Sequence, residues 1–493
     1  MENQTIKKVV IAGGGTAGWT AAAALSRQLG SLLDITLIES DQIGTVAVGE
    51  ATIPTIRTFH HLLGIDEKAF MRATQASFKL GIAFEDWGGL DERYFHAFGQ
   101  IGKSTWMGDF HHIWMMAKAN GLAGELGDYC FELQAAEAGK FATSEHSKLN
   151  YAYHLDAGLY ARFLRQMSEG NGVSRVEGKI TKVEQVADTG YIEALVLESG
   201  ERVEGDLFID CTGFRGLLIE ETLKTGYEDW SEYLPMDSAL AVQTEATDPA
   251  LPYTRSIAHE SGWQWRIPLR HRVGNGLVYC SKYISDEDAR TALFDNIQGK
   301  TLTEPRVINF KTGCRRKVWT KNCVALGLST GFVEPLESTS IHLIQNGIIR
   351  LIQLFPFNGM DDALIRHYNE QSKEELVSIR DFIILHYKQT ARDDSAFWRD
   401  QQAMDIPDTL AQRIALFKEN AHAYQAPDDL FRVDSWVQVM MGQGLVPKGY
   451  HHMGALMSTE QMQKALGGIK SNIAKAVESM PPHQQFLDQY CAD

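Results

Sequence analysis

The spacing of apolar and polar positions near the start of the chain predicts a strand, a glycine turn, a helix and a second strand. Residues 9–12 are a short β-branched apolar run, and residues 13–18 are rich in glycine. Residues 20–29 are rich in alanine and leucine and are expected to form a helix that ends near Gly30, whereas residues 35–39 read as a strand. Together these segments predict one βαβ unit.

Further along the chain, the pattern predicts a second group of strands and then mainly helices. Strands are expected within residues 173–186, 192–197 and 202–210. Helices are expected at residues 59–84, which include Lys79, and at residues 110–139. Beyond Ser338 helical periodicity dominates, at residues 341–354, 364–390, 410–424 and 461–480. We therefore expect an α/β fold with a nucleotide-binding core, an additional sheet and a mainly helical C-terminal part.

Composition and charge narrow the class of protein. A chain of 493 residues that is 44% hydrophobic and 22% charged is ordinary for a globular enzyme with a large core. Its 47 basic and 63 acidic residues give a net charge of -16, which repels nucleic acid and anionic lipid surfaces. A small neutral substrate is compatible with this charge.

The cysteines and the N-terminal residues predict a reduced protein without a metal. No Cys-x-x-Cys pair and no histidine cluster at metal-ligand spacing occur, so we expect neither a structural metal nor a disulfide framework. The first eight residues lack the features of a secretory signal, and no apolar run reaches the roughly 20 residues that a membrane-spanning helix needs. We expect a cytoplasmic protein with no membrane partner.

The glycine turn indicates a dinucleotide. Gly13, Gly15 and Gly18 follow a strand and open a helix, so backbone amides and the helix N-terminus can meet a pyrophosphate. Glu39 ends the second strand, where an acidic side chain binds a ribose hydroxyl pair. A lone fingerprint of this kind is also compatible with a simple tight turn. FAD is favoured over NAD because the sequence shows only one such unit.

Three further motifs accompany the glycine turn. They are Ser77-Phe78-Lys79-Leu80-Gly81, then Trp263-Gln264-Trp265-Arg266-Ile267-Pro268, and finally Pro335-Leu336-Glu337-Ser338-Thr339. Alone, the tryptophan motif is explained as a core-facing strand and the lysine as a solvated side chain. In combination with the glycine turn, the chain resembles the flavin-dependent halogenases, the tryptophan halogenase group in particular.

The resemblance implies a set of cofactor and halide residues. Leu328 and Ile341 would lie against FAD, and residues 46–54, which include Gly49, Glu50 and Ala51, would be the strap segment that passes over the flavin. Backbone at Thr339 and Ser340 would hold the halide. A helix that begins near Ser338 offers free N–H groups for that anion. The family usually has glycine where this chain has Ser340. The expected FAD residues are Gly13, Gly15, Thr16, Ala17, Gly18, Glu39, Gly49, Glu50, Ala51, Leu328 and Ile341.

The resemblance also implies the reaction. A separate flavin reductase would supply FADH2, and chloride or bromide would be oxidised with O2 to hypohalous acid. That acid would pass to Lys79, whose apolar neighbours favour a desolvated amine. Glu337 would be the catalytic carboxylate, and Ser338 would link it toward the lysine. Trp263, Trp265, Ile267 and Pro268 would be structural and would keep organic substrate away from the flavin.

The substrate is expected to be an electron-rich aromatic. His96 and Phe98 resemble the pair that sandwiches the indole ring in tryptophan halogenases. The family's paired tyrosines and glutamate, which clamp a free amino acid, have no counterpart in residues 429–436, where Phe431 or Trp436 would supply a third ring. Indole or an indole derivative is therefore expected in preference to free tryptophan. Two alternatives remain, an FAD-dependent aromatic monooxygenase and a flavoprotein sensor without turnover.

The expected organisation is a single interleaved unit. The FAD-binding core would comprise approximately residues 1–60, 148–220 and 310–360. The substrate sheet and its helices would comprise approximately residues 61–147 and 221–309, followed by a helical C-terminal part at residues 361–493. A homodimer is compatible with the sequence.

Overall fold

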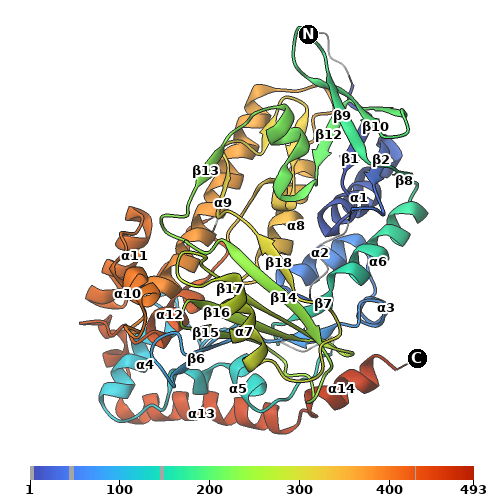
Figure 1. Ribbon diagram of the computed structural model, residues 1–493. Helices are drawn as coiled ribbons and strands as arrows, with labels where there is room; N and C mark the ends of the chain where they lie inside the picture. Colours follow the sequence, from blue (N-terminus) through green and yellow to red (C-terminus); the bar gives the residue numbers. More distant parts are fainter. Residues whose placement is uncertain (1–4, 44–48, 145–148, 428, 493) are drawn as a thin grey trace. The chain divides into compact units, whose positions relative to one another are not determined.

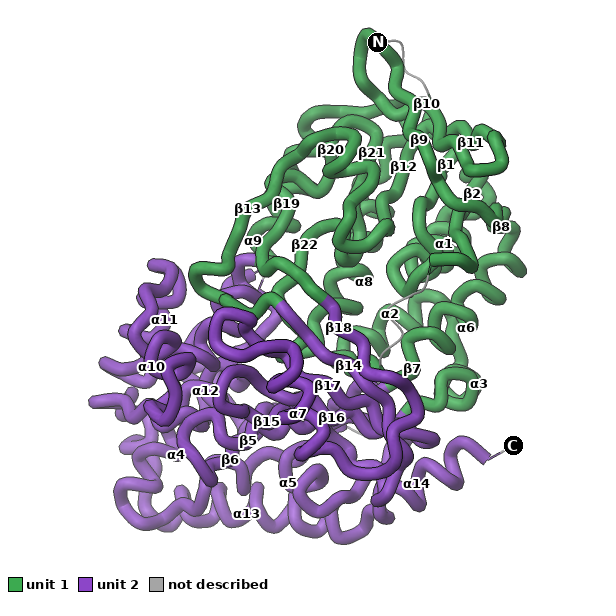
Figure 2. Tube along the Cα trace, in the orientation of Figure 1, with its two compact units in different colours: residues 1–76, 155–237, 309–376 green, residues 77–154, 238–308, 377–493 purple. Residues whose placement is uncertain are grey.

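The chain alternates between two compact units. The computed structural model describes residues 5–43, 49–144, 149–427 and 429–492. Unit 1 contains Met1–Ala76, Leu155–Asp237 and Asn309–Leu376, and unit 2 contains Ser77–His154, Ser238–Ile308 and Val377–Asp493 (Figure 2). Each unit is therefore assembled from segments that are far apart in the sequence.

Unit 1 is built on a six-stranded sheet. The strand order is β20-β21-β12-β1-β2-β8, of which Figure 1 labels β12, β1, β2 and β8. Neighbouring strands are parallel except for the antiparallel pair of β20 and β21. The strands are β1 (Lys8–Ala12), β2 (Asp34–Glu39), β8 (Ser174–Glu177), β12 (Leu207–Asp210), β20 (Trp319–Thr320) and β21 (Cys323–Ala325). A parallel sheet of this kind places the loops that follow its strands along one edge, where nucleotides bind.

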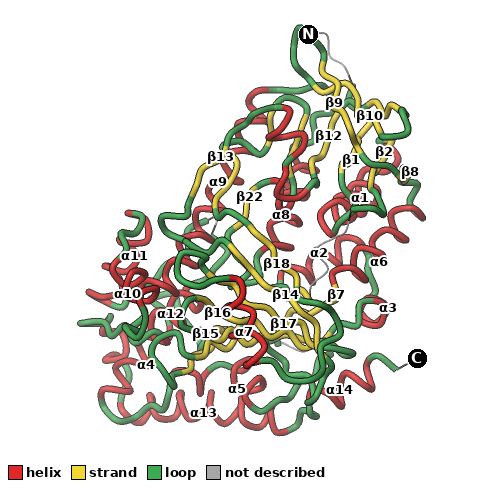
Figure 3. The backbone as a smooth tube through the Cα atoms, in the orientation of Figure 1, coloured by secondary structure: helices red, strands yellow, loops and turns green. Residues whose placement is uncertain are grey.

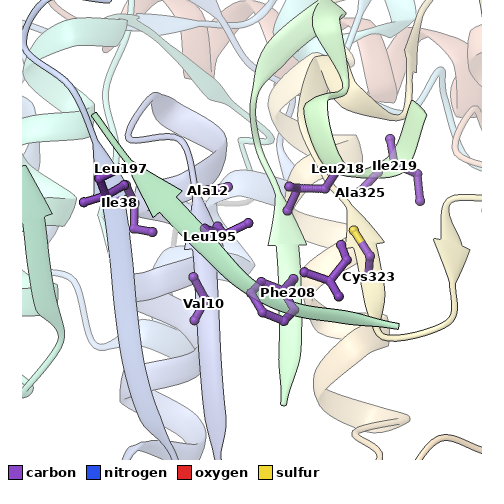
Figure 4. Close-up of a cluster of buried hydrophobic side chains, with 11 residues drawn as sticks. Val10, Ala12, Ile38, Leu195, Leu197, Phe208, Leu218, Ile219, Cys323 and Ala325 are labelled. Atoms are coloured by element: carbon purple, nitrogen blue, oxygen red, sulfur yellow. The ribbon is translucent and has the colours of Figure 1, made fainter. Parts of the chain in front are cut away.

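Two smaller antiparallel sheets complete the strands of unit 1. The first joins β9 (Ile180–Gln185), β10 (Ile192–Leu197) and β11 (Arg202–Glu204), and the second joins β13 (Tyr227–Asp229), β19 (Gly313–Arg315) and β22 (Gly331–Phe332). Leu195 and Leu197 of β10 pack with Val10, Ile38 and Phe208 of the parallel sheet (Figure 4). This buried apolar cluster fixes the strands from which the nucleotide loops emerge.

Helices surround the parallel sheet. They are α1 (Thr16–Leu29), α2 (Thr55–Leu63), α3 (Glu67–Ala73), α6 (Ala157–Gly170) and α8 (Ser340–Gln353), with short turns η1 (Gly30–Leu32), η3 (Gly213–Arg215), η4 (Leu217–Thr222) and η5 (Gly327–Ser329). The alanine-rich helix α1 packs against α6 and α8. Its small side chains allow this close approach, and residues 18–26 are buried.

Unit 2 is built on a seven-stranded sheet. The order of the sheet is β18-β14-β17-β16-β15-β5-β6, and β4 (Ser77–Lys79) pairs antiparallel with β7 (Ala152–Asp156). The sheet strands are β5 (Gly81–Glu85), β6 (Arg93–Ala97), β14 (Ser238–Thr244), β15 (Thr254–His259), β16 (Gly262–Pro268), β17 (Val273–Tyr279) and β18 (Arg306–Asn309).

The helices of unit 2 come mostly from the C-terminal third of the chain. Figure 3 draws all helices in red. Those of unit 2 are α4 (Phe110–Ala119), η2 (Leu126–Tyr129), α5 (Phe131–Glu137), α7 (Asp286–Asn296), α10 (Ala396–Ala403), α11 (Asp408–Asn420), α12 (Val433–Gly442), η6 (His452–Leu456), α13 (Thr459–Glu478) and α14 (His483–Tyr490). The long helix α9 (Asp362–Lys388) begins in unit 1 and ends in unit 2, and β3 (Gly49–Ala51) belongs to unit 1.

The structure confirms the α/β fold, the βαβ start and the helical C-terminal part. The prediction of a helix over residues 59–84 is wrong in its second half. Helix α3 ends at Ala73, and the chain then enters strands β4 and β5. The segment from Ser77 to Phe84 is buried, so every side chain meets protein and tertiary packing decides the conformation. The predicted helix at residues 110–139 is two helices separated by the turn η2.

Candidate active site

The glycine loop after β1 combines two glycines that the fold requires with one that leaves space. A Cβ on Gly13, which has φ +108°, would lie 2.3 Å from the carbonyl oxygen of Cys211. A Cβ on Gly18 would lie 1.8 Å from the carbonyl oxygen of Gly13. By contrast, no described heavy atom lies within 4 Å of a Cβ on Gly15. The backbone at Gly15 therefore faces room in which a phosphate group can approach it.

The N-terminus of α1 is suited to an anion. Gly15 is its N-cap, and no side chain in the described structure caps this end of the helix. The first turn of the helix, which contains Thr16 and Ala17, has no acidic residue. Its amide N–H groups and the helix dipole consequently favour a pyrophosphate. A Cβ on Gly327 would lie 2.7 Å from the Cβ of Ala17, so the η5 turn with Leu328 lies beside this helix start.

Glu39 ends β2 beside the glycine loop, as the sequence predicts. Its Oε2 lies where a Cβ on Gly14 would be, and the indole Nε1 of Trp19 donates to Oε2 over 3.2 Å. Arg175 Nε donates to Oε1 over 2.6 Å, and Arg165 Nη1 lies 3.4 Å from the same oxygen. The two arginines come from β8 and α6 and have no sequence signal that connects them with Glu39. They hold the carboxylate in place next to the nucleotide loop by charge-assisted hydrogen bonds.

Asp210 is a residue of this edge that motif reasoning missed. It ends β12, it is fully buried, and its Oδ2 accepts hydrogen bonds of 2.8 Å from the amides of Leu218 and Ile219. Its Oδ1 accepts a 3.1 Å hydrogen bond from the hydroxyl of Ser329. Asp210 therefore ties the turns η4 and η5 to the carboxyl edge of the parallel sheet.

The strap assigned to residues 46–54 is described only in part. Residues 46–48 lie outside the described residues, whereas Gly49, Glu50 and Ala51 form β3. Burial raises the pKa of Glu50 to about 7. A carboxyl group of this pKa is partly protonated at neutral pH, so it can donate as well as accept a hydrogen bond.

The Pro-Leu-Glu-Ser-Thr motif leads into helix α8. Glu337 and Thr339 are each 1% exposed, and Thr339 is the N-cap of α8 without a capping hydrogen bond from its side chain. Ser338 has φ +60°, an uncommon conformation for a residue with a side chain. Ser340 opens the helix and Ile341 is buried in its first turn. The N–H groups of a helix start of this kind can stabilise an anion.

Lys79 lies on strand β4, not on a helix, and its side chain is fully buried. The sequence prediction of a desolvated amine is therefore supported, although the predicted helix is wrong. The Nζ atom lies 5.2 Å from the centroid of the Phe98 ring. A desolvated ammonium over an aromatic face is a favourable cation–π pair. The structure thus brings together two of the residues singled out from the sequence, Lys79 and Phe98.

The tryptophan motif forms β16, with Trp263 and Trp265 on one face, as predicted. The two indoles are 6.2 Å apart between ring centroids, and they are 1% and 7% exposed. Ile267 and Pro268 are buried at the end of the same strand. The indole of Trp265 fits against Gly276 of β17, because a Cβ there would lie 2.0 Å from Trp265 Cζ2. These contacts give the motif a packed, structural role within unit 2.

An aromatic cluster gathers three of the proposed substrate residues. The His96 ring lies 6.0 Å from Phe431, and both rings contact Phe382 of α9 at 5.4 Å and 3.7 Å. The rings of Trp436 and Phe382 pack edge-on with their centroids 4.9 Å apart. The guanidinium of Arg413 lies 4.4 Å from the centroid of the Trp436 ring. Phe382 lies in an apolar run of α9 that carried no specific signal in the sequence.

The edge of the parallel sheet in unit 1 has the features of a flavin nucleotide site. The open space at Gly15, the uncapped start of α1 and the carboxylate of Glu39 fit the pyrophosphate and ribose of FAD, and the α/β fold is that of a Rossmann-type flavoprotein. This site, the buried lysine and the strand of paired tryptophans together define a flavin-dependent enzyme class.

Comparison with known proteins specifies the family. The tryptophan halogenase family model matches residues 8–459. A flavin-dependent halogenase from Xanthomonas campestris is 55% identical, with a TM-score of 0.97 and 99% of each chain covered. A flavin-dependent halogenase from Brevundimonas sp. BAL3 is 44% identical, with a TM-score of 0.94 and the same coverage. The tryptophan 6-halogenase of Streptomyces toxytricini is 34% identical over 99% of both chains.

The chain belongs to the tryptophan halogenase family. It is a flavin-dependent halogenase, an enzyme that uses FADH2 from a separate flavin reductase and a halide ion. None of the helices within the described ranges is long and apolar enough to cross a membrane. In the same residues, no group of three or more His, Cys, Asp or Glu side chains is arranged to hold a metal ion.

Proposed function

We propose that this protein chlorinates or brominates an electron-rich aromatic such as indole or an indole derivative, through hypohalous acid held at Lys79. Relatives that are 55% and 44% identical are described as flavin-dependent halogenases without a named substrate, whereas the tryptophan 6-halogenase is 34% identical. Residues 429–436 also lack the paired tyrosines expected of an amino-acid clamp. Both observations support a substrate without the amino and carboxylate groups of tryptophan.

The nucleotide residues of unit 1 would hold FAD. The amides at the start of α1, from Gly15 to Gly18, would bind the pyrophosphate, and Glu39 would bind a ribose hydroxyl. Leu328, Ile341 and the strap residues Gly49, Glu50 and Ala51 would line the rest of the cofactor. Reduced FAD together with O2 supplies the oxidising equivalents that convert the halide into hypohalous acid.

The start of helix α8 would hold the halide. The backbone N–H groups of Thr339 and Ser340 are offered by a helix terminus that has no side-chain cap. Halides are weakly hydrated anions that such N–H groups bind without a counter-charge. Because the serine at position 340 still presents its N–H group, it retains this function.

Lys79 would hold hypohalous acid by a hydrogen bond from its ammonium group or as a haloamine. In the halogenation step the aromatic ring carbon forms a bond to the halogen while the halogen–oxygen bond breaks. The oxygen leaves as water after it takes up a proton, and the ring proton passes to the Glu337 carboxylate. Ser338 would orient that carboxylate. Positioning of this kind and acid–base assistance are each worth about two to four orders of magnitude in rate.

The observation that carries this proposal is the complete burial of Lys79 against Phe98. Lysine is almost never fully buried in a protein unless it is paired, so a fully buried lysine side chain over an aromatic ring is an uncommon arrangement. The test is Lys79→Ala, assayed with a flavin reductase, NADH, bromide and indole by mass spectrometry. Halogenated indole should fall by at least about 100-fold while FAD affinity is unchanged. Lys448→Ala is the matched control, because Lys448 is exposed and pairs with Glu419 on the surface.

Substrate class is tested separately. Indole, 3-substituted indoles and free tryptophan would be compared at equal concentration with chloride and with bromide. The proposal requires kcat/KM for indole to exceed that for tryptophan, and a strong preference for tryptophan overturns this part of it.

We further propose that the protein is cytoplasmic and that it forms a homodimer. We also propose that unit 1 binds FAD and that unit 2 binds substrate.

A further inference from the structure

A chain of hydrogen bonds connects the strand that carries Lys79 with the end of the tryptophan motif. The hydroxyl of Ser77 lies 2.5 Å from the carbonyl oxygen of Pro268, the last residue of the tryptophan motif. The same hydroxyl oxygen is 3.1 Å from Nδ1 of His154. On the other side of the ring, Nε2 of His154 is 2.9 Å from the hydroxyl of Thr254. All four residues belong to unit 2, and Ser77 and His154 are fully buried.

The chemistry of these groups fixes the tautomer of His154. A proline carbonyl can only accept, so the hydroxyl proton of Ser77 is used in the bond to Pro268. Nδ1 of His154 then donates to the oxygen of Ser77, and in the neutral ring Nε2 accepts from the hydroxyl of Thr254. Burial, followed by the neighbouring charge of Lys79 and then that of His483, lowers the pKa of His154 well below its usual value, against a smaller opposing effect of the Pro268 carbonyl. A lowered pKa favours the neutral ring.

The strand register places this ring on the face of the lysine. Ser77 pairs with His154, and Lys79 pairs with Ala152, in the antiparallel ladder of β4 and β7. Side chains alternate along a strand, so Ser77 and Lys79 project to the same side of β4. Consequently the His154 ring and the small Ala152 side chain lie on the same face of the β4–β7 ladder as the Lys79 side chain.

Contacts that do not involve Ser77 or His154 also hold the chain at Phe78 and Leu80. The amide of Phe78 donates to Nε2 of His483 over 3.3 Å, and the Phe78 ring stacks on Phe141 at 4.0 Å. The amide of Leu80 donates to the carbonyl of Pro252 over 2.7 Å. With only three residues, β4 has too short a ladder to fix a flexible lysine alone, so its position depends on these surrounding bonds.

We propose that His154 is the positioning residue for Lys79, acting through Ser77 to connect the lysine strand with the end of the tryptophan motif at Pro268. This inference rests on the proposed role of Lys79. The inference also assigns a role to Pro268. Its carbonyl oxygen accepts the hydrogen bond from the Ser77 hydroxyl and so sets the direction of the next hydrogen bond, from His154 to Ser77. The inference further predicts that loss of His154 uncouples formation of hypohalous acid from its delivery to the substrate.

The test compares His154→Leu with His154→Asn, because the two new side chains have the same number and branching of heavy atoms. The amide nitrogen of asparagine can take the place of Nδ1 and donate to Ser77, whereas leucine cannot. For His154→Leu we expect kcat for indole bromination to fall by at least about tenfold, with KM for indole and FAD affinity unchanged. Hypohalous acid released into solution and trapped by monochlorodimedone should stay the same or rise. His154→Asn should retain kcat within about threefold of the wild type.

Two controls separate positioning from general damage. His60→Gln removes another buried histidine, one that bonds Tyr160 in unit 1, and should leave kcat within about twofold. Thr254→Val removes only the hydroxyl that donates to His154, so it tests the inference even where His154→Leu does not fold, and it should lower kcat by about threefold or more.

The outcomes are distinct. Equal losses in His154→Leu and His154→Asn, or a parallel loss of trapped hypohalous acid, overturn the inference, as does unchanged kcat in Thr254→Val. If Lys79→Ala is inactive while His154→Leu keeps its kcat, only the positioning role fails. If Lys79→Ala still halogenates indole, the proposed function itself fails.

Discussion

Ser77 donates a hydrogen bond of 2.5 Å from its hydroxyl to the carbonyl oxygen of Pro268. The residue two positions before Lys79 is thereby joined to the end of the strand that carries the paired tryptophans. In Ser77→Ala the carbonyl of Pro268 and Nδ1 of His154 both lose a buried partner. We expect the free energy of unfolding to fall by about 1–3 kcal/mol, measured by urea denaturation.

Ser199→Ala is the comparison for this substitution. Ser199 is exposed and accepts one hydrogen bond of 3.3 Å from the amide of Glu201. Ser199→Ala removes this hydrogen bond and should change the free energy of unfolding by less than about 0.5 kcal/mol. Equal effects of the two substitutions would show that the bond from Ser77 to Pro268 adds nothing to stability.

Gly276 is predicted to be irreplaceable because it accommodates Trp265. A Cβ at this position would lie 2.0 Å from Trp265 Cζ2 and 2.5 Å from the carbonyl oxygen of Leu240. Gly276→Ala therefore forces the indole or the strand to move. We expect a loss of about 1–3 kcal/mol in the free energy of unfolding, together with a change in tryptophan fluorescence.

A glycine-to-alanine substitution at a position with open space should instead raise the free energy of unfolding. Gly468 lies inside helix α13, and no described atom is within 4 Å of an added Cβ. Gly468→Ala should stabilise the protein by about 0.5–1 kcal/mol, because glycine is a poor helix former. Stabilisation by Gly276→Ala as well would refute the packing role of that glycine.

Gly15 distinguishes the needs of the fold from those of the cofactor. Since an added Cβ would touch no described atom, Gly15→Ala should leave the stability of the FAD-free protein unchanged. FAD affinity should nevertheless fall by at least about tenfold, which is about 1.4 kcal/mol, because the methyl group occupies space meant for the pyrophosphate. Titration of flavin fluorescence and thermal unfolding without FAD measure the two quantities.

Gly18→Ala provides the contrast. Its Cβ would lie 1.8 Å from the carbonyl oxygen of Gly13, so the FAD-free protein itself should be destabilised. If Gly15→Ala bound FAD as tightly as the wild type, the pyrophosphate would not lie at that amide.

Local periodicity was sufficient to predict the βαβ start and the long C-terminal helices, since their apolar positions repeat with a single period. It was wrong around Lys79. The run from Ser77 to Phe84 is buried throughout, so no polar positions record the alternation of a strand. The strand conformation follows instead from pairing of β4 with β7 and of β5 with β15, both distant in sequence, and from pairing of β5 with the nearby strand β6.

For the site, residues within a compact motif could be predicted, but their partners could not. Lys79 and Glu337 stand in recognisable motifs, and both are buried. The arginines that hold Glu39 are separated from it by 126 and 136 positions, and His154 is separated from Ser77 by 77. Only the folded chain brings such groups together, because no local pattern couples residues on different elements.

The buried histidines should make stability depend on pH, and His60 permits a clean measurement. Burial lowers the pKa of His60 from 6.5 to about 3, and its Nε2 lies 2.9 Å from the hydroxyl of Tyr160. Below pH 6.5 the unfolded chain protonates this ring while the folded protein does not. The unfolded state therefore binds more protons between about pH 3 and pH 6.5, so the free energy of unfolding falls as the pH falls in this window.

Comparison of the wild type with His60→Gln isolates this one group, because all other titrating residues are common to both proteins. As the pH is lowered from 6.5, the wild type should lose stability relative to the variant by up to about 1.4 kcal/mol per pH unit. Above pH 7 the difference between them should be constant and should favour the wild type. Urea denaturation at half-unit intervals of pH measures it. A difference that stays flat down to pH 4 would mean that His60 takes up its proton in the folded protein, so its ring would not be held neutral against Tyr160 and Phe70, whose ring centroid lies 4.5 Å away.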